Sequence, residues 1–329
     1  MSQEATPPPP ISINAFVLDG AGGAQKLSVE EADRTRHSSK PVWMRVNFGD
    51  TRGRKWLMDG SGLDETVVDA ILQEESRPRT LVFEKGVLIV LRGVNLNPGA
   101  DAEDMISVRT WLEPGRIITA SRRRLRSLDD IEGLFEQKHG PDSPQSMLIE
   151  LIDRLGDYIA DVIDKLEGEI EEAESSISDP DIIIHNSPFS LSRRRSARLR
   201  RYMAPQREAL DRVSRLTNEW FSAEQLAEIR EQENRFTLMI EDLDLVRERA
   251  LVAQEEFLGI VAHQQNTRML VLSIIAAVFL PLSFLTGLMG MNVAGLPGTV
   301  NPLSFWWLVL GMVGTAGAIL VLFHFKRWL

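Results

Sequence analysis

The chain has 329 residues, a formal net charge of −10 and no cysteine. Without cysteine the protein has no disulfide bond and no thiolate metal site, so metal chemistry must use histidine, carboxylate, carbonyl or water ligands. The proline-rich start, residues 7–10, lacks the basic and apolar regions of a signal peptide. Residues 1–12 are expected to be disordered.

Residues 13–140 predict an α+β cytosolic domain. Short β-rich segments separated by glycine or proline lie at residues 43–48, 80–83, 87–94, 105–111 and 116–120. Lys85 and Gly86 predict a hairpin turn between two of these strands. Helical spacing of apolar residues predicts helices over residues 64–74 and 128–137.

Residues 144–222 predict long cytosolic helices. One covers residues 145–176 and ends in a very acidic stretch, and a second, over residues 191–217, begins rich in arginine. A third begins after Ser222, a plausible N-cap, and meets no proline before Pro281. If continuous, this helix has roughly 65 residues and a length of about 100 Å. Its first part, residues 223–268, is expected to be a stalk that leads into the membrane.

Two apolar stretches follow, at residues 269–289 and 305–325. Each has about 20 residues, the length that a helix needs to cross a bilayer. Arg268 precedes the first stretch, Lys326 and Arg327 follow the second, and the loop of residues 290–304 has neither lysine nor arginine. By the positive-inside rule, both termini and the tail, residues 326–329, are expected to be cytoplasmic, as in a multi-pass protein of a bacterial inner (plasma) membrane.

Two helices cannot enclose an aqueous pore, so the hairpin is either a membrane anchor or one chain's part of the wall of an oligomeric pore. Small and polar residues recur at three- and four-residue spacing along one side of the first span, among apolar neighbours. Such a stripe faces protein or water rather than lipid, although small residues can also serve helix packing alone. The candidate pore-lining residues are Asn266, Met269, Leu270, Ser273, Ala277, Leu280, Ser283 and Gly287.

Residues 281–292, which end in Gly290-Met291-Asn292, resemble the signature that closes the first membrane helix in the CorA superfamily of divalent-cation channels and transporters. The ending of residues 325–329, with a basic pair before Trp328 and Leu329, is also similar, and the order of parts agrees along nearly the whole chain. The resemblance implies a funnel-shaped homo-oligomer, a pentamer, with Gly290, Met291 and Asn292 as its selectivity filter. It also implies a basic collar of Lys326 and Arg327 around the inner mouth.

The loop after the triplet distinguishes branches of the superfamily. Residues 295–298, Gly-Leu-Pro-Gly, resemble an element of the ZntB zinc-transporter branch, whereas the magnesium branch usually has an acidic loop. Met291 departs from the valine or isoleucine of many ZntB-like sequences. Zinc is therefore the expected cation, with Co²⁺, Ni²⁺, Cd²⁺ or Mg²⁺ as other candidates. A CorA-type magnesium/cobalt channel remains the alternative.

A ring of Asn292 side chains in such an oligomer would present amide oxygens to the waters of a hydrated divalent ion. Stripping those waters would be unnecessary, which suits an ion that dehydrates reluctantly. Glu255 and His263 extend the stripe inward, as a candidate acidic ring at the inner mouth and a candidate metal or proton site. Each can equally be an ordinary solvated side chain of the stalk.

The arginine-rich start of the second long helix has no interleaved aromatic residues, so no nucleic acid is expected as a partner. It is expected to pair with the acidic helix end or to lie near the inner leaflet. The sequence has no visible nucleophile, nucleotide loop or catalytic dyad, which predicts a transporter rather than an enzyme, with no cofactor. Transport would then be driven by ion or proton gradients, with proton symport as one form of coupling. The alternative from another class is a helical scaffold that the hairpin only anchors to the membrane.

Overall fold

A computed structural model describes residues 12–35, 40–74, 77–177, 188–216, 220–291, 296, 298 and 301–326. Nearly all of the expected disordered N-terminus therefore lies outside the described residues, and so do Asn292 and Arg327. The chain divides into two compact units, Met1–Gln254 and Glu255–Leu329.

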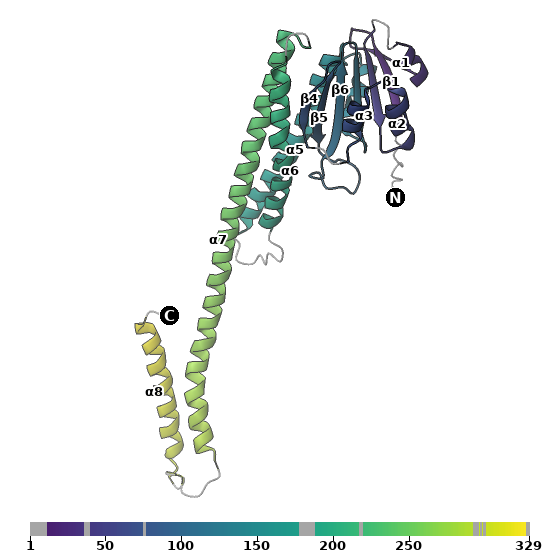
Figure 1. The fold of residues 1–329 in the computed structure, drawn as a ribbon. Coiled ribbons are helices and arrows are strands. Elements are labelled where there is room, and N and C mark those ends of the chain that lie inside the picture. The colour runs from purple at the N-terminus through teal and green to yellow at the C-terminus, as the bar shows by residue number, and fades with distance from the viewer. Residues whose placement is uncertain are drawn as a thin grey trace. The chain divides into compact units, whose positions relative to one another are not determined.

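A seven-stranded sheet forms the centre of the α+β part of the first unit (Figure 1). Its strand order is β2-β1-β3-β7-β6-β5-β4, and only the β3–β7 pair is parallel. The strands are β1 (Ile13–Leu18), β2 (Ala24–Leu27), β3 (Val42–Asn47), β4 (Arg79–Val82), β5 (Val87–Gly93), β6 (Ile106–Glu113) and β7 (Arg116–Ser121).

Short helical segments lie before residue 144. The long helices that follow form the helical part of the first unit and the C-terminal hairpin. The short ones are α1 (Val29–Thr35), α2 (Thr51–Lys55), the π-helical turn η1 (Trp56–Gly60), α3 (Glu65–Leu72) and α4 (Arg126–Glu136). The long ones are α5 (Pro144–Ile177), α6 (Pro188–Ser214), α7 (Ala223–Met289) and α8 (Ser304–Phe325).

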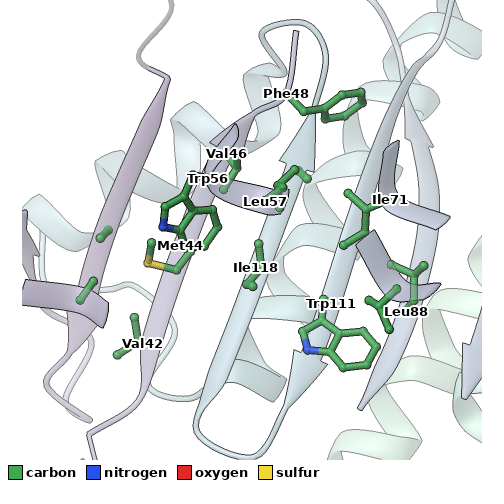
Figure 2. Close-up of a cluster of buried hydrophobic side chains, with 14 of the residues drawn as sticks. Val42, Met44, Val46, Phe48, Trp56, Leu57, Ile71, Leu88, Trp111 and Ile118 are labelled. Atoms are coloured by element: carbon green, nitrogen blue, oxygen red, sulfur yellow. The ribbon is translucent and has the colours of Figure 1, made fainter. Parts of the chain in front are cut away.

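The hydrophobic core lies on both faces of the sheet. On one face, side chains from alternate strand positions pack against η1 and α3, and Figure 2 shows Met44, Ile118 and Trp111 beside Leu57 and Ile71. On the other face, α5 contacts β5, β6 and β7. Strands that are covered on both faces bury nearly every residue, and β7 is buried throughout.

Ion pairs between helices hold the α5, α6 and α7 segments of the first unit together. Arg235 of α7 binds Asp157 of α5 at 2.6 Å, and Arg249 binds Glu174 at 2.6 Å. Arg195 of α6 lies 3.0 Å from Glu169, which confirms that the arginine-rich helix pairs with the acidic end of α5. These contacts supplement the packing of helices whose buried faces are largely apolar.

The predicted long helices are present, with ends that differ by a few residues. The third is continuous for 67 residues and passes through both Gly259 and Pro281. The predicted hairpin turn is present too, because the Phe83 amide donates to the Gly86 carbonyl oxygen at 2.8 Å between β4 and β5.

Candidate pore-lining helix and membrane hairpin

The second unit consists of the last part of α7, the connection and α8. Both helices are long and apolar enough to cross a membrane. No residue of α8 is buried, and Phe284 of α7 is 69% exposed. A continuous apolar surface of this size is not stable in water, so it must be covered by lipid or by other protein.

Each helix of the hairpin has one half-buried face. On α7 the half-buried residues are Leu270, Ile274, Ala277, Val278, Pro281, Leu282 and Leu285. On α8 they include Ser304, Leu308, Met312, Thr315, Ile319 and Phe323. Both sets recur at three- and four-residue spacing, so these are the faces along which the two antiparallel helices approach one another (Figure 1).

The predicted stripe lies mostly away from this packed face. Leu270 and Ala277 belong to the half-buried face beside α8, and the other members of the stripe are exposed. The exposed members are Asn266, Met269, Ser273, Leu280, Ser283 and Gly287. A methyl group added at Gly287 would meet no atom within 4 Å in the single chain. The stripe is therefore available to water or to another copy of the chain.

Phe284 also lies on this face, and sequence reasoning missed it. It is one helical turn beyond Leu280 and one turn before Gly287, so it lies in line with both. The count along the helix took Ser283, four residues before Gly287, and passed over Phe284, three residues before it. Leu280 and Phe284 are thus two large apolar side chains one turn apart on this face.

The helix runs through Pro281 although proline lacks an amide hydrogen. Pro281 therefore cannot donate to the carbonyl oxygen of Ala277, four residues earlier, at the edge of the stripe. One turn later the Thr286 hydroxyl donates to the carbonyl oxygens of Leu282 and Ser283 at 3.1 and 3.0 Å. A side chain thus supplements the main-chain bonds close to the proline.

The helix ends at the predicted triplet. The Gly290 amide donates to the Thr286 carbonyl oxygen at 2.9 Å, and a Cβ at Gly290 would lie 2.9 Å from that same oxygen. Glycine therefore lets the chain turn closely against the last helical turn. Met291 is 46% exposed beyond it, whereas Asn292 lies outside the described residues.

The candidate inner-mouth residues are separate positions on the stalk and tail. Glu255 and His263 are both exposed, and Lys326 follows the last turn of α8. Within the described ranges, no three histidine or acidic side chains are grouped to hold a metal ion. Glu255 and His263 stay candidates as members of a ring formed by several copies of the chain.

The described residues thus combine an α+β domain, long helices and a two-helix apolar hairpin. Residues 38–327 match the family described as "CorA-like Mg2+ transporter protein". Because this match covers most of the sequence, the chain belongs to the CorA-like family of divalent-cation transport proteins.

Similar proteins agree with this membership along the whole chain. The divalent cation transporter CmaX of Pseudomonas aeruginosa is 36% identical over 326 residues, which cover 96% of each chain. The zinc transport protein ZntB of Pectobacterium carotovorum is 30% identical over 318 residues, 97% of this chain and 96% of that protein.

Solved structures show the same architecture. Full-length CmaX superposes with a TM-score of 0.81 at 33% identity, over 96% of this chain and 97% of that one. The CorA magnesium transporter of Methanocaldococcus jannaschii superposes with a TM-score of 0.77 over 97% of this chain and 99% of that one. Its sequence is 17% identical, so this match shows a similar fold.

Proposed function

We propose that the protein is a homo-oligomeric, most simply pentameric, transporter that carries divalent cations across the bacterial inner membrane along a pore lined by α7. One observation carries this proposal. A single helix continues from the stalk into the membrane and presents, away from α8, a stripe that contains Asn266, Ser273, Ser283 and Gly287. One chain cannot enclose water with two helices, so several stripes must face a common axis.

The outer end of this pore is the triplet Gly290-Met291-Asn292. Gly290 supports this position of the triplet at the end of the pore, because it ends α7 in a close turn. Asn292 amide oxygens would hydrogen-bond the water shell of the ion, so that the cation passes largely hydrated. Weak affinity and modest selectivity are then expected, since a chain without cysteine offers no thiolate cage.

Zinc is the cation that we favour, with Co²⁺, Ni²⁺ or Cd²⁺ as lesser substrates. ZntB relatives are named for zinc, and the loop of residues 290–304 lacks any carboxylate. Magnesium is the second candidate, supported by the description of the matching family. Glu255 or His263 would be the titrating group if transport is coupled to protons as symport.

Topology follows from the distribution of basic residues. Arg268, Lys326 and Arg327 lie at the inner ends of the spans and the outer loop has none, so both termini lie in the cytoplasm. Lys326 and Arg327 would surround the inner mouth in the oligomer as a basic collar.

Reconstitution into liposomes tests the proposal. Purified protein should take up Zn²⁺, reported by a trapped fluorescent indicator, and uptake should rise when a pH gradient is imposed. Mg²⁺ uptake with exclusion of Zn²⁺ would favour the magnesium alternative, and Zn²⁺ flux that ignores the gradient would remove proton coupling. Liposomes that leak no more than protein-free liposomes, whichever cation is offered, would leave only the anchored scaffold.

A further inference from the structure

The first unit contains a cavity of about 610 Å³ that the transport proposal does not use. Arginines from the α+β part line it, namely Arg54, Arg92, Arg109, Arg122 and Arg123. Two more arginines, Arg198 and Arg201, reach it from α6. We call it the arginine cavity. Among the described residues, the carboxylates that line it are Asp50, Glu74, Glu103 and Asp104, three fewer than the arginines.

The parallel pairing of β3 with β7 builds the floor of this cavity. Both strands end at the same edge of the sheet, and the Phe48 amide donates to the Ser121 carbonyl oxygen at 3.1 Å just beyond them. Gly49 is needed here, because a Cβ would lie 2.4 Å from the carbonyl oxygen of Arg122. The turn after β3 thus lies directly against Arg122 and fixes its main chain.

Arg109 shows that the site is built into the fold and is more than a basic surface. It is 3% exposed, its Nη2 donates to the Gln73 carbonyl oxygen at 2.7 Å, and its guanidinium lies 4.5 Å from the Phe48 ring centroid. These contacts orient the guanidinium at the wall of the cavity. Burial, followed by repulsion from Arg92, Arg122 and Arg79, lowers the pKa of Arg109 to about 10.

Arg92 is held in a similar way. Its Nη1 donates to the Met105 carbonyl oxygen at 2.8 Å, and its guanidinium lies 4.3 Å from the Tyr202 ring centroid. Its main-chain amide donates to the Gln206 side chain at 2.6 Å, which ties β5 to α6 close to Arg201. Two carboxylates of the cavity are already engaged elsewhere, since Glu103 lies 3.2 Å from Arg195 and Asp50 accepts from the Ser12 hydroxyl.

We propose that the arginine cavity binds a phosphorylated small molecule with at least two phosphate groups, of the size of a nucleoside polyphosphate. Oriented guanidinium groups match phosphate oxygens in pairs, and several of them around one cavity select high negative charge. The volume lies in the range of ligand pockets of drug-sized molecules. A polyphosphate compensates the mutual repulsion of arginines held close together.

Calorimetric titration of the full-length protein in detergent tests this. The probes are ATP, pyrophosphate and orthophosphate, at constant ionic strength and with EDTA to remove divalent cations. ATP and pyrophosphate should bind at one site per chain and more tightly than orthophosphate. Equal affinity for all three would contradict a polyphosphate site, and no heat with any of them would overturn the proposal.

A pair of double variants separates the site from general charge attraction. Arg122→Gln with Arg201→Gln removes two exposed lining arginines and should weaken ATP binding by about a hundredfold, at roughly tenfold for each charged contact. Arg52→Gln with Arg194→Gln removes the same charge from exposed positions that do not line the cavity and should leave affinity unchanged. Equal weakening of ATP binding in the two double variants would show that ATP responds to the overall charge of the protein and not to the cavity.

The same variants distinguish a ligand site from a subunit contact. Unfolding temperatures without ligand should match in the two double variants, and so should the oligomer mass. If the lining variant instead changes the mass while wild-type protein binds no phosphate, an acidic surface of a second chain occupies the cavity and the proposal is wrong.

Discussion

Asn292 carries the sharpest prediction about a single residue. Asn292→Ala removes the ring of amide oxygens that would hold the water shell of the ion. We expect Zn²⁺ uptake into liposomes to fall to the protein-free level while the oligomer mass is unchanged, because the residue lies beyond the end of α7.

Asn301→Ala is the matched control in the same loop. Its side chain accepts from the Leu303 amide at 2.9 Å at the start of α8, outside the triplet. This variant should transport as the wild type does. Uptake at the wild-type rate in Asn292→Ala would mean that this side chain does not recognise the ion.

Phe284 gives a second residue-scale prediction. With Leu280 it would form an apolar constriction in a pore, and such constrictions close by dewetting. Phe284→Ser should therefore raise basal cation leak several-fold in the liposome assay. Phe279→Ser changes an equally exposed phenylalanine on another side of α7 and should have little effect, so a similar leak in both variants would place Phe284 outside the pore.

Sequence reasoning recognised the stripe but not all of its members. Helical periodicity fixed which positions share a face, and the structure places most of them away from α8. Phe284 was missed because the count stepped four residues from Gly287 to Ser283, whereas a step of three residues leads to Phe284. The arginine cavity was missed for a different reason. Its arginines come from α2, β5, β6, α6 and the loop after β7, and only tertiary folding brings them together.

At the scale of elements, α5 and α7 have an acidic contact whose pH dependence can be measured. Glu167 has its pKa raised, first by burial and then by Asp242 and Asp164, with Arg249 opposing. A carboxyl group whose pKa is raised by folding binds its proton more tightly in the folded state. Its contribution to stability is therefore lost as pH rises from the unfolded pKa through the folded pKa.

Glu167→Gln should remove the free-energy cost of keeping a charged carboxylate beside Asp242 and Asp164. At pH 7 we expect the variant to be more stable by roughly 0.5 kcal/mol, seen as an unfolding temperature higher by about 1–2 °C in detergent. The gain should vanish below about pH 4, where both states are protonated. Glu172→Gln, an exposed change one turn and a half away, is the control. A gain that persists at low pH would assign the effect to something other than charge.

Elements with a strong local pattern were predictable, and those that depend on tertiary context were not. The buried strands β5, β6 and β7 and the long helices were located within a few residues. β2 is a short edge strand whose two middle residues are exposed, so no apolar alternation marks it. The parallel β3–β7 pair joins strands far apart in sequence, and no turn signal predicts such a pair.

For the whole molecule, the surface of the membrane hairpin decides the state of assembly. No residue of α8 is fully buried in a single chain, and most of the stripe on α7 is exposed. Lipid can cover the apolar side chains, but Ser273 and Ser283 favour water or another polar group over hydrocarbon. In an oligomer of several chains around an axis, the stripes would face a water-filled interior while α8 faces lipid. The polar and the apolar side chains would then both lie in a favourable environment.

The protein should therefore be a stable homo-oligomer in mild detergent, with a pentamer as the expected form. Native mass spectrometry would give the number of chains, each of 37.0 kDa. Ser273→Leu, which makes the stripe more compatible with lipid, should leave the fold of the first unit intact and reduce transport by obstructing the interior. A monomer at micromolar concentration in the wild type would contradict the pore, because one hairpin has no interior through which a hydrated cation can pass.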